Sequence, residues 1–403
     1  MIQIRRTNMK TTGKIFAGLL SVLLLVASAS VFSACSAESG SSAPAVGNNG
    51  AAPTETVDHG TLNVSFPVGN IRVAINILAL KLGYFSEEGV KVNEVNLGGQ
   101  NALTAINEGS DELDILAAGF VPDLQAIASG YDLRFFGGTA VEGGAVIAKK
   151  GSAAKYKDGS AILNIEAVKN AKLGFVRNEA SWIVTRQFLL DNGVTEAEIA
   201  AIENEAGGSI TYYGETTETA LAVQKGEIDL GFLPMEYALL YADAYDFELV
   251  TPAGALQPDY VCCREVSSPA KLSAKRDAVV AYEIARLRAY EYYKQGETDE
   301  AVRKNVVKIV SDYSGKESDY VDTYLYAGVT KYSNDPNAKG IASYVKAAWN
   351  SGALSGAAVD FGTYDISQNI DTTLYKEALD TVLARDPSNS VYQDLLALYE
   401  QSN

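Results

Sequence analysis

The stretch LNVSFPVGN, residues 62–70, sets the pattern from which the fold is predicted. Its first five residues are typical of a short, largely buried strand, and the PVGN that follows is typical of a loop. Apolar residues then recur at Val73, Ile77 and Leu80, which is the spacing of one face of a helix. A strand, a glycine-containing loop and a helix in this order open an α/β unit.

The same order recurs along the chain in two successive units. The first unit continues with strands at 90–95, 115–118 and 133–137 and with helices at 102–107 and 122–130. The second unit has strands at 172–176, 210–213 and 228–233 and helices at 179–192, 217–225 and 234–245. Strands that alternate with helices predict parallel sheets covered on both faces. We therefore predict an α/β protein with two lobes.

Two segments are expected to link these units, and a helical tail follows them. Residues 145–148 are expected to cross from the first unit to the second, and residues 260–263 to cross back. Helical periodicity dominates the rest of the chain, at 278–294, 301–312, 341–350, 374–384 and 391–399. The predicted domains are lobe 1 at 59–146 and 256–403, with the helical tail at its periphery, and lobe 2 at 147–255.

The amino terminus has the order of a secretory signal. Four basic residues precede an apolar run at 15–26, which is shorter than the roughly 20 residues of a membrane span, and small residues follow. VFSAC at 31–35 resembles a lipobox, with a phenylalanine where an aliphatic residue is usual. We therefore predict a signal peptide at 1–34, a lipid on Cys35 that anchors the chain outside the cytoplasm at the cell membrane, and a flexible tether at 35–58. The alternative is ordinary cleavage nearby and a soluble secreted product.

The charge of the chain excludes one class of partner. The 33 basic and 50 acidic residues give a net charge of −17, which becomes −21 once residues 1–34 and their four basic side chains are removed. Nucleic-acid binding needs a basic surface that pairs with phosphates. We therefore predict no nucleic-acid partner and interpret the acidic surface as a means to solubility.

The sequence lacks the residues that most catalytic and metal sites need. His59, beside the tether, is the single histidine, so a Ser-His-acid or Cys-His arrangement has no base. No metal site and no cofactor are expected, because there is neither a histidine cluster nor a spaced cysteine pair. Cys262 and Cys263 are adjacent, which strains a mutual disulfide, so we expect buried strand thiols; a vicinal redox pair is the alternative. A hydrolase that uses an acidic pair is compatible with the composition, but no motif supports it.

Several phrases of the sequence occur in the order found in one known family. LKLGYF at 80–85 with EGV at 88–90 is similar to the A-x-x-x-G-Y-F-x-x-E-G-L segment of nitrate/sulfonate/taurine-type periplasmic binding proteins, relatives of the thiamine-pyrimidine precursor binders. GGQNAL at 98–103, with EG at 108–109 and Asp114, resembles the family's G-G-x-x-x-L-x-A-L-x-x-G-x-x-D stretch.

Two further phrases, AGFVP at 118–122 and KGEID at 225–229, fall where the family's phrases do, so the resemblance spans residues 62–260. It implies a type II periplasmic binding fold, a discontinuous first lobe and a ligand in the cleft between the lobes. It also implies a monomer that delivers a small molecule to the permease and ATPase subunits of an ABC importer. Helix N-termini that face such a cleft suit an anionic group. The alternative function is a ligand-binding sensor lipoprotein that reports to a signalling partner.

Three loops of the first lobe are candidates for ligand contact. Asn70 and Arg72 follow the first strand, where the guanidinium can clamp a carboxylate or sulfonate and the amide can cap a helix or reach the ligand. Gly99 and Gln100 open the next helix, where the glycine lets a ligand approach the backbone. Phe120 ends a central strand and offers an apolar wall.

The candidates from the second lobe begin with Asn178, Ser181 and Trp182 in one turn. Ser181 offers its hydroxyl and its N–H to an anion, and Trp182 can stack on a heterocycle. Glu142 and Glu236 are candidates to pair with a ligand amine. The family's common Gly-Ser/Thr turn is missing, which weakens the prediction of a small oxyanion. We therefore expect a small organic solute that carries a sulfonate or carboxylate, or one that resembles a pyrimidine.

Overall fold

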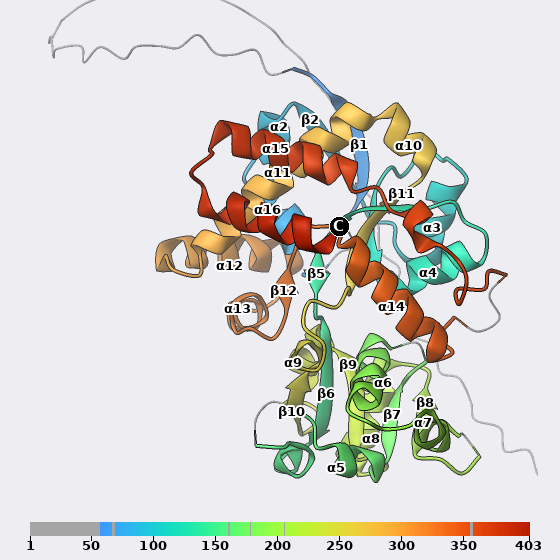
Figure 1. Cartoon of the computed structure of the whole chain (residues 1–403). Helices are drawn as coiled ribbons and strands as arrows, with labels where there is room; N and C mark the ends of the chain where they lie inside the picture. Colours follow the sequence, from blue (N-terminus) through green and yellow to red (C-terminus); the bar gives the residue numbers. More distant parts are fainter. Residues whose placement is uncertain (1–56, 67–68, 160–161, 178, 205, 355–357) are drawn as a thin grey trace, which may run out of the picture. The chain divides into compact units, whose positions relative to one another are not determined.

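The computed structural model describes residues 57–66, 69–159, 162–177, 179–204, 206–354 and 358–403. The predicted signal peptide and Cys35 lie outside the described residues, as does most of the predicted tether. Within the described part of the chain, no helix combines the length and the apolar character needed to cross a membrane. The described residues form two α/β lobes (Figure 1): the strands of lobe 1 lie in a two-stranded and a three-stranded sheet, and those of lobe 2 in one five-stranded sheet.

Lobe 1 contains five strands: β1 (Gly60–Ser65), β2 (Val90–Val95), β3 (Leu116–Gly119), β4 (Arg134–Gly138) and β11 (Cys263–Ser267). β1 and β2 are parallel, and a bridge between Val64 and Ile115 joins β1 to the segment that leads into β3. β11 lies between β3 and β4 and runs antiparallel to both. β11 is not among the strands predicted for the two units, and it is antiparallel because it enters lobe 1 on the way back from lobe 2.

The first half of lobe 1 contains four helices: α1 (Ala74–Lys81), α2 (Tyr84–Glu87), α3 (Gly99–Asn107) and α4 (Phe120–Ala128). They confirm the predicted strand–loop–helix order. α1 begins four residues after Asn70, with Val73 at its N-cap, so Asn70 does not cap this helix. The loop at Asn70 and the first turn of α4 thus both follow strands of lobe 1.

Lobe 2 contains a five-stranded sheet in the order β10-β6-β9-β7-β8. Its strands are β6 (Gly144–Lys149), β7 (Leu173–Val176), β8 (Ile210–Tyr213), β9 (Leu230–Pro234) and β10 (Phe247–Pro252). Its helices are α5 (Ile165–Lys169), α6 (Ala180–Asp191), α7 (Glu196–Glu203), α8 (Thr216–Lys225) and α9 (Met235–Tyr241). β7, β8 and β9 are parallel, whereas β6 and β10 are antiparallel. Residues 145–148, expected to cross between the units, instead belong to β6.

The sequence analysis missed α7, although its start carries a clear signal. Thr195 accepts the N–H of Glu198, and the Glu198 carboxylate accepts the N–H of Thr195 in return. This reciprocal pair is a capping box, which satisfies two backbone donors at a helix N-terminus.

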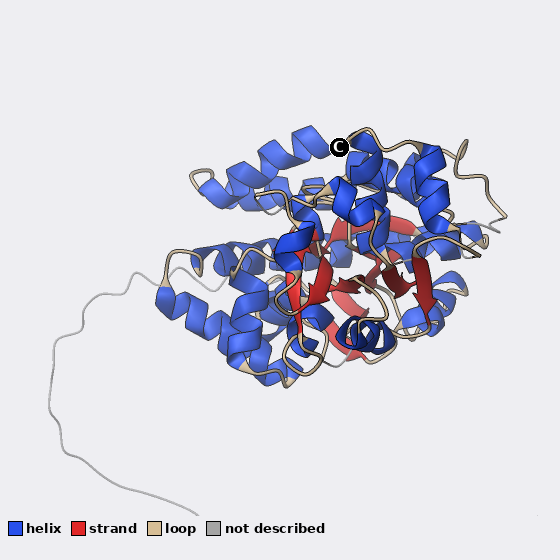
Figure 2. Ribbon diagram, turned by 90° about the horizontal axis from the view of Figure 1, so that it is seen from below, coloured by secondary structure: helices blue, strands red, loops and turns tan. Residues whose placement is uncertain are grey.

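The tail contains seven helices in the described residues: α10 (Pro269–Ala274), α11 (Arg276–Gln295), α12 (Glu300–Ser314), α13 (Ser318–Tyr326), α14 (Ala338–Asn350), α15 (Thr373–Arg385) and α16 (Ser390–Ser402). α11 packs against α1, α2 and α15, and Figure 2 shows the strands enclosed by helices. The tail also reaches lobe 2, because α13 contacts α9 and α14 contacts α6. A short strand, β12 (Lys331–Tyr332), pairs with β5 (Ala140–Val141) beside the first crossing. The tail is therefore more than the periphery of lobe 1.

A fully buried ion network fastens α1 and α11 to β11. The Arg286 guanidinium lies 2.5 Å from the Glu265 carboxylate and 2.7 Å from that of Glu283. Asn76 accepts from Arg286 at 3.0 Å and donates to Glu265 at 2.8 Å, and Tyr282 donates to Glu265 at 2.6 Å. Buried charges need such partners, because an unpaired charge in the interior is costly. We interpret this network as structural.

Candidate binding site between the lobes

Arg72 of lobe 1 reaches Glu236 of lobe 2. Its Nε lies 3.4 Å from Glu236 Oε2, with 31% of the Arg72 side chain and 13% of the Glu236 side chain exposed. Asn70 Oδ1 accepts the Arg72 backbone N–H at 2.9 Å and its Nε at 3.3 Å. Burial lowers the pKa of Arg72, but the Glu236 carboxylate and the neighbouring thiols and Tyr324 raise it more. The two predicted ligand contacts are thus paired with each other.

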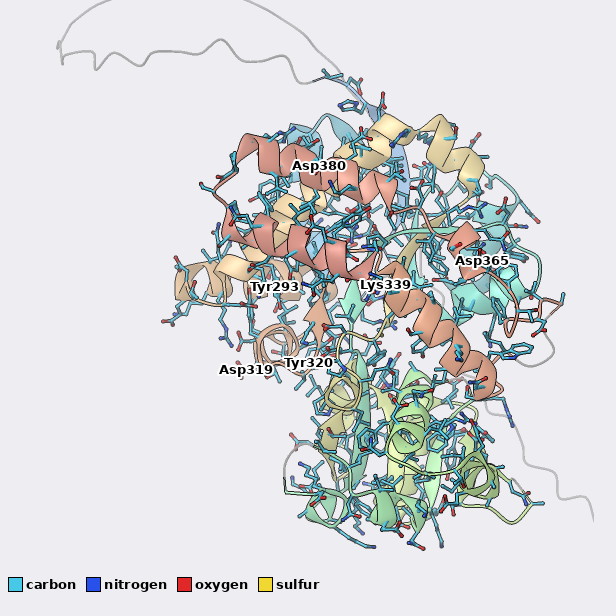
Figure 3. The ribbon with its side chains drawn as sticks, in the orientation of Figure 1. Tyr293, Asp319, Tyr320, Lys339, Asp365 and Asp380 are labelled. Carbon is cyan, nitrogen blue, oxygen red and sulfur yellow. The ribbon has the colours of Figure 1, made fainter. Side chains whose placement is uncertain are left out.

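Tyr320 strengthens the same junction from the tail. This residue of α13 donates its hydroxyl to the backbone carbonyl of Glu236 at 3.0 Å, and Figure 3 shows it on the lobe 1 helix that lies next to lobe 2. The start of α9 is therefore held from lobe 1 through both the side chain and the backbone of Glu236.

The strand that returns from lobe 2 carries the two cysteines into the same region. Their sulfur atoms lie 3.7 Å apart, with Cys263 buried in β11 and Cys262 half-buried just before it. The expectation of buried strand thiols is therefore confirmed for Cys263 but wrong for Cys262, which precedes the strand. The hydrogen bond from Cys262 and the charge of Arg72 lower the pKa of Cys263 to about 7, against the effect of burial.

Glu179 fills the N-terminus of α6 that we predicted for a ligand anion. Its Oε1 accepts the Ser181 N–H at 3.3 Å and lies 3.1 Å from the Ser181 hydroxyl. Ser181 is fully buried, accepts the Ala145 N–H at 3.2 Å and also lies 3.1 Å from the Leu233 carbonyl oxygen. Burial raises the pKa of Glu179 to about 7, although the Ser181 hydrogen bonds and Arg72 lower it. The protein therefore supplies its own carboxylate to this helix terminus.

Gly144 allows Ser181 and Tyr260 to approach the backbone at the start of β6. A Cβ at this position would lie 2.5 Å from Ser181 Oγ and 2.8 Å from the Tyr260 hydroxyl. Both contacts are closer than carbon and oxygen tolerate, so only glycine fits between the two side chains.

Three buried tyrosines surround the region, and two of them come from the helical tail. Tyr344 on α14 stacks on Tyr260, with ring centroids 6.2 Å apart. It also makes a T-shaped contact with Phe120, with ring centroids 5.5 Å apart. Tyr324 on α13 faces Arg72 and Glu236. The hydroxyl oxygens of Tyr324 and Tyr344 have no hydrogen-bond partner among the described residues. Burial raises the pKa of both, so they are neutral hydroxyls.

Asp123, in the first turn of α4, is the most unusual member of the region. It is fully buried, and neither of its carboxylate oxygens has a hydrogen-bond partner within the part of the chain that the structure describes. The preceding strand places it beside Cys263, because Gly119 pairs with Cys263 and Phe120 donates its N–H to the Cys262 carbonyl. Burial, followed by the nearby Cys263, raises the pKa of Asp123 well above its usual value.

We call this set the interlobe cluster. Its members are Arg72, Asp123, Glu179, Glu236, Tyr260, Cys262, Cys263, Tyr324 and Tyr344. Most buried polar groups in proteins have hydrogen-bond partners, so several orphaned groups at one place indicate a binding site. No group of three or more His, Cys, Asp or Glu side chains among the described residues is arranged to hold a metal ion.

Seven of the predicted ligand contacts are not members of the interlobe cluster. Asn70, Phe120 and Ser181 hydrogen-bond to or pack against members, whereas the other four are exposed or have side-chain partners elsewhere. Gly99 and Gln100 are exposed, and the Gln100 amide donates to Tyr131 at 3.1 Å. Trp182 is packed in the core of lobe 2, stacked on Phe175 at 5.3 Å. A further predicted contact, Asn178, lies outside the described residues.

Glu142 is the fourth of these residues, and it lies between β5 and β6 where the chain passes from lobe 1 to lobe 2. Its carboxylate accepts the Asp259 N–H at 2.6 Å and the Lys331 ammonium at 2.8 Å. Its backbone is left-handed, with φ of 57°. The side chain therefore joins the crossing segments to each other.

Sequence reasoning missed Asp123, Glu179, Tyr260, Tyr324 and Tyr344. Asp123 and Glu179 had a usable signal, because each is an acid in the turn between a strand and a helix of an α/β unit, where such sites form. Tyr324 and Tyr344 of the tail had no such sequence signal, since their place in the cluster depends on how α13 and α14 pack.

The arrangement of two α/β lobes joined by crossing strands, with a discontinuous first lobe, is the fold of periplasmic binding proteins, and solved structures confirm it. The nitrate-binding protein NrtA from Synechocystis PCC 6803 has a TM-score of 0.58 at 12% identity, over 80% of this chain and 88% of that one. The aliphatic sulphonate binding protein SsuA from Escherichia coli has a TM-score of 0.54 at 16% identity, over 77% and 92%. The ligand-binding component of an ABC-type import system from Staphylococcus aureus, with zinc bound, has a TM-score of 0.57 at 13% identity, over 79% and 98%.

These likenesses confirm the predicted fold class and the predicted resemblance to nitrate- and sulfonate-binding proteins at the level of fold. No family model matches the sequence, and no curated protein matches it.

Proposed function

We propose that this chain is a solute-binding protein of an ABC importer that captures a small organic solute in the interlobe cluster. The fold supports a binding role, and the orphaned buried groups of Asp123, Tyr324 and Tyr344 carry the proposal. Tyr324 and Tyr344 belong to tail helices that contact lobe 2, and Asp123 lies in the helix that follows β3 in lobe 1. A bound solute would supply the hydrogen bonds that these groups lack.

The proposal includes export and anchoring. Residues 1–34 direct export, Cys35 carries the lipid, and residues 35–58 act as the tether. Replacing Cys35 with alanine should release the protein from the membrane fraction, and mass spectrometry of the wild-type amino terminus should show the acyl chains. Wild-type protein that lacks acyl chains and stays in the soluble fraction would contradict this part of the proposal.

We further propose that the chain crosses between lobes at residues 141–143 and 259–262. β5 and β6 end and begin around the first segment, and a bridge between Val141 and Val261 connects the two segments. When the lobes move, these two short segments would adjust, together with the α13–α9 and α14–α6 contacts and the contacts of Arg72 and Tyr320 with Glu236. X-ray scattering should show a smaller radius of gyration with ligand than without it.

The direct test is a thermal-shift screen of the processed full chain over sulfonates, carboxylates, amino acids, polyamines and heterocycles. A ligand that binds only the folded state raises the melting temperature by mass action. A hit should be confirmed by calorimetry, and mass spectrometry should recover it unchanged after incubation. Chemical conversion of the hit would overturn the proposal in favour of an enzyme.

A further inference from the structure

We infer that the interlobe cluster takes an organic solute with a protonated nitrogen group, such as an amine or an amidine, attached to a flat ring. This inference rests on the proposed function, and it selects among the solutes that sequence analysis left open. It favours a cation over a sulfonate or carboxylate.

The charges of the cluster are the first reason. Arg72 is the one cation among its members and is already paired with Glu236, while the buried Arg264, next to Cys263 in β11, donates to the Cys263 carbonyl at 2.8 Å. Asp123 and Glu179 remain, and neither has a cationic partner within hydrogen-bond distance in the described chain. A protonated amine would be compensated by these carboxyls once they release their protons, whereas an anion would gain no counter-charge from them and would find Arg72 already paired.

The start of α6 is the second reason. In binding sites for anions, helix N-termini offer free backbone N–H groups to the ligand. Here Glu179 Oε1 already accepts the Ser181 N–H, and Ser181 Oγ is engaged with Glu179 and the Ala145 N–H. A ligand anion at this terminus would compete with a carboxylate that belongs to the chain.

The tyrosines are the third reason. Tyr260 and Tyr344 present a stacked pair of rings, at an interplanar angle of 16°, and Phe120 adds a third ring. Such rings pack against a flat apolar body and attract cations through their faces. The hydroxyl oxygens of Tyr324 and Tyr344, which lack partners among the described residues, can accept N–H donors from the same ligand.

The raised pKa values of the two buried acids predict that ligand binding releases protons. Burial raises the pKa of Glu179 to about 7 and that of Asp123 well above its usual value, so both acids tend to hold a proton while no cation is near. Arg72, Tyr260 and Tyr344 lie close enough to Glu179 for their charges to interact with its carboxyl, and Cys263 lies close enough to Asp123. A cation that binds should therefore release protons from these carboxyls.

A ring-matched series of probes tests the inference on the processed full chain. Benzamidine and benzylamine carry a positive charge, benzoate and benzenesulfonate carry a negative charge, and all four share one ring. We expect the two cations to raise the melting temperature increasingly with their concentration and the two anions to leave it unchanged. Calorimetry of benzamidine at pH 7 in buffers of different ionisation enthalpy should show proton release by the protein.

Two conservative variants locate the effect. Asp123→Asn and Glu179→Gln keep the size of each side chain, and the amide oxygen that Glu179→Gln introduces can still accept the Ser181 N–H. Each should weaken benzamidine binding at least tenfold. Asp380→Asn is the control, because Asp380 is an exposed acid on α15 that pairs with Lys376 (Figure 3), and it should bind as the wild type does.

The outcomes separate the ligand class from the function. Stabilisation by the anions but not by the cations would overturn the ligand class and leave the proposed function standing. The inference would also be overturned if the cations bind without proton release and if neither Asp123→Asn nor Glu179→Gln weakens their binding. If no solute in the broad screen stabilises the chain, the proposed function itself fails. The proton measurement uses the unaltered chain, so a variant that does not fold leaves the test intact.

Discussion

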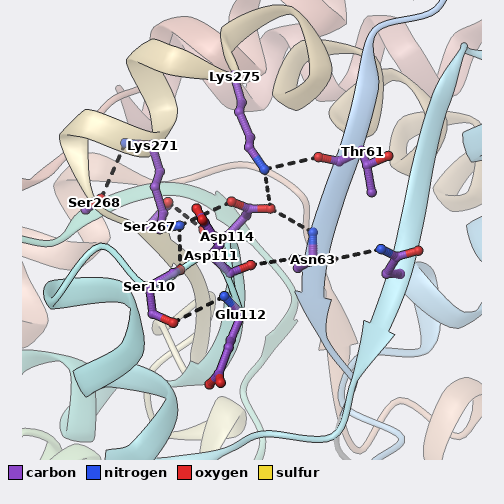
Figure 4. Close-up of polar contacts among 11 residues, drawn as sticks. Thr61, Asn63, Ser110, Asp111, Glu112, Asp114, Ser267, Ser268, Lys271 and Lys275 are labelled. Atoms are coloured by element: carbon purple, nitrogen blue, oxygen red, sulfur yellow. Dashed lines mark hydrogen bonds and ion pairs between the residues drawn. The ribbon is translucent and has the colours of Figure 1, made fainter.

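Asp114 and Asp123 are both buried carboxylates of lobe 1, 2% and 0% exposed, yet their surroundings differ completely. Asp114 accepts the Asn63 N–H at 2.8 Å, Lys275 at 2.7 Å and Lys271 at 3.3 Å (Figure 4). Asp123 has no hydrogen-bond partner among the described residues. The same side chain therefore fastens β1 to α10 and the segment before α11 in one place and has no partner in the other, where we propose that a ligand binds.

Whether a buried charged group has partners distinguishes a structural site from a binding site more reliably than burial alone does. The Arg286 network and Asp114 are buried and paired, as groups that stabilise a fold must be. The interlobe cluster includes groups that are as deeply buried, such as Asp123 and Tyr324, but these have no hydrogen-bond partner among the described residues. We expect substitutions in the first kind of site to change stability and substitutions in the second kind to change binding.

The largest expected effect is that of Asp114→Asn. The change leaves Lys271, which is 11% exposed, without its counter-charge, and breaking a buried ion pair typically costs about 3–5 kcal/mol. Urea denaturation should show a loss near the lower end of this range, because Lys271 keeps its bond to the Ser110 carbonyl. Glu112→Gln, an exposed neighbour, is the control and should change the free energy of unfolding by less than about 0.5 kcal/mol. A loss below that of the control would mean that the Asp114 contacts contribute nothing.

The next effect concerns pH. The pKa of Glu179 is about 7 in the folded chain, above the ordinary value of 4.5 for a glutamate, so between these two values the folded state holds a proton that the unfolded state releases. The free energy of unfolding should therefore fall as pH rises through this window, by at most about 1.4 kcal/mol per pH unit. Glu179→Gln should remove this part of the slope. Identical slopes in wild type and variant would show that Glu179 is ionised throughout.

A smaller effect is expected for Arg72→Ala. It removes an interlobe ion pair that is partly exposed, which contributes about 1 kcal/mol or less. It also leaves Glu236 without this counter-charge, so the affinity for benzamidine should stay equal or rise, and Arg72→Lys should behave as the wild type does. A tenfold loss of benzamidine affinity in Arg72→Ala would contradict this expectation and show that the guanidinium belongs to the binding surface.

The residues explain why the sequence reveals the fold better than the site. Strand–loop–helix periodicity is local, so it gives both lobes, but it does not show that β6 and β11, which adjoin the crossings between lobes, join the sheets as antiparallel strands. Arg72 and Glu236 were each identified as candidates, but no local pattern says that side chains so far apart in the sequence will pair with each other. The Trp182 side chain could stack on a ligand or fill the core, and only the packing of lobe 2 decides between these two roles.

The smallest expected effect on stability is that of Asp123→Asn, which completes the comparison with Asp114. Burial raises the pKa of Asp123 and so favours its neutral form, and an amide of the same shape replaces that form without losing a hydrogen bond. The free energy of unfolding in urea should change by less than about 0.5 kcal/mol, the low end of what one hydrogen bond contributes. Measured beside Asp114→Asn, the two variants make the same replacement at equally buried aspartates, so any gap between them reports the partners alone. A loss from Asp123→Asn as large as that from Asp114→Asn would place Asp123 among the structural carboxylates and remove the main support for the binding site.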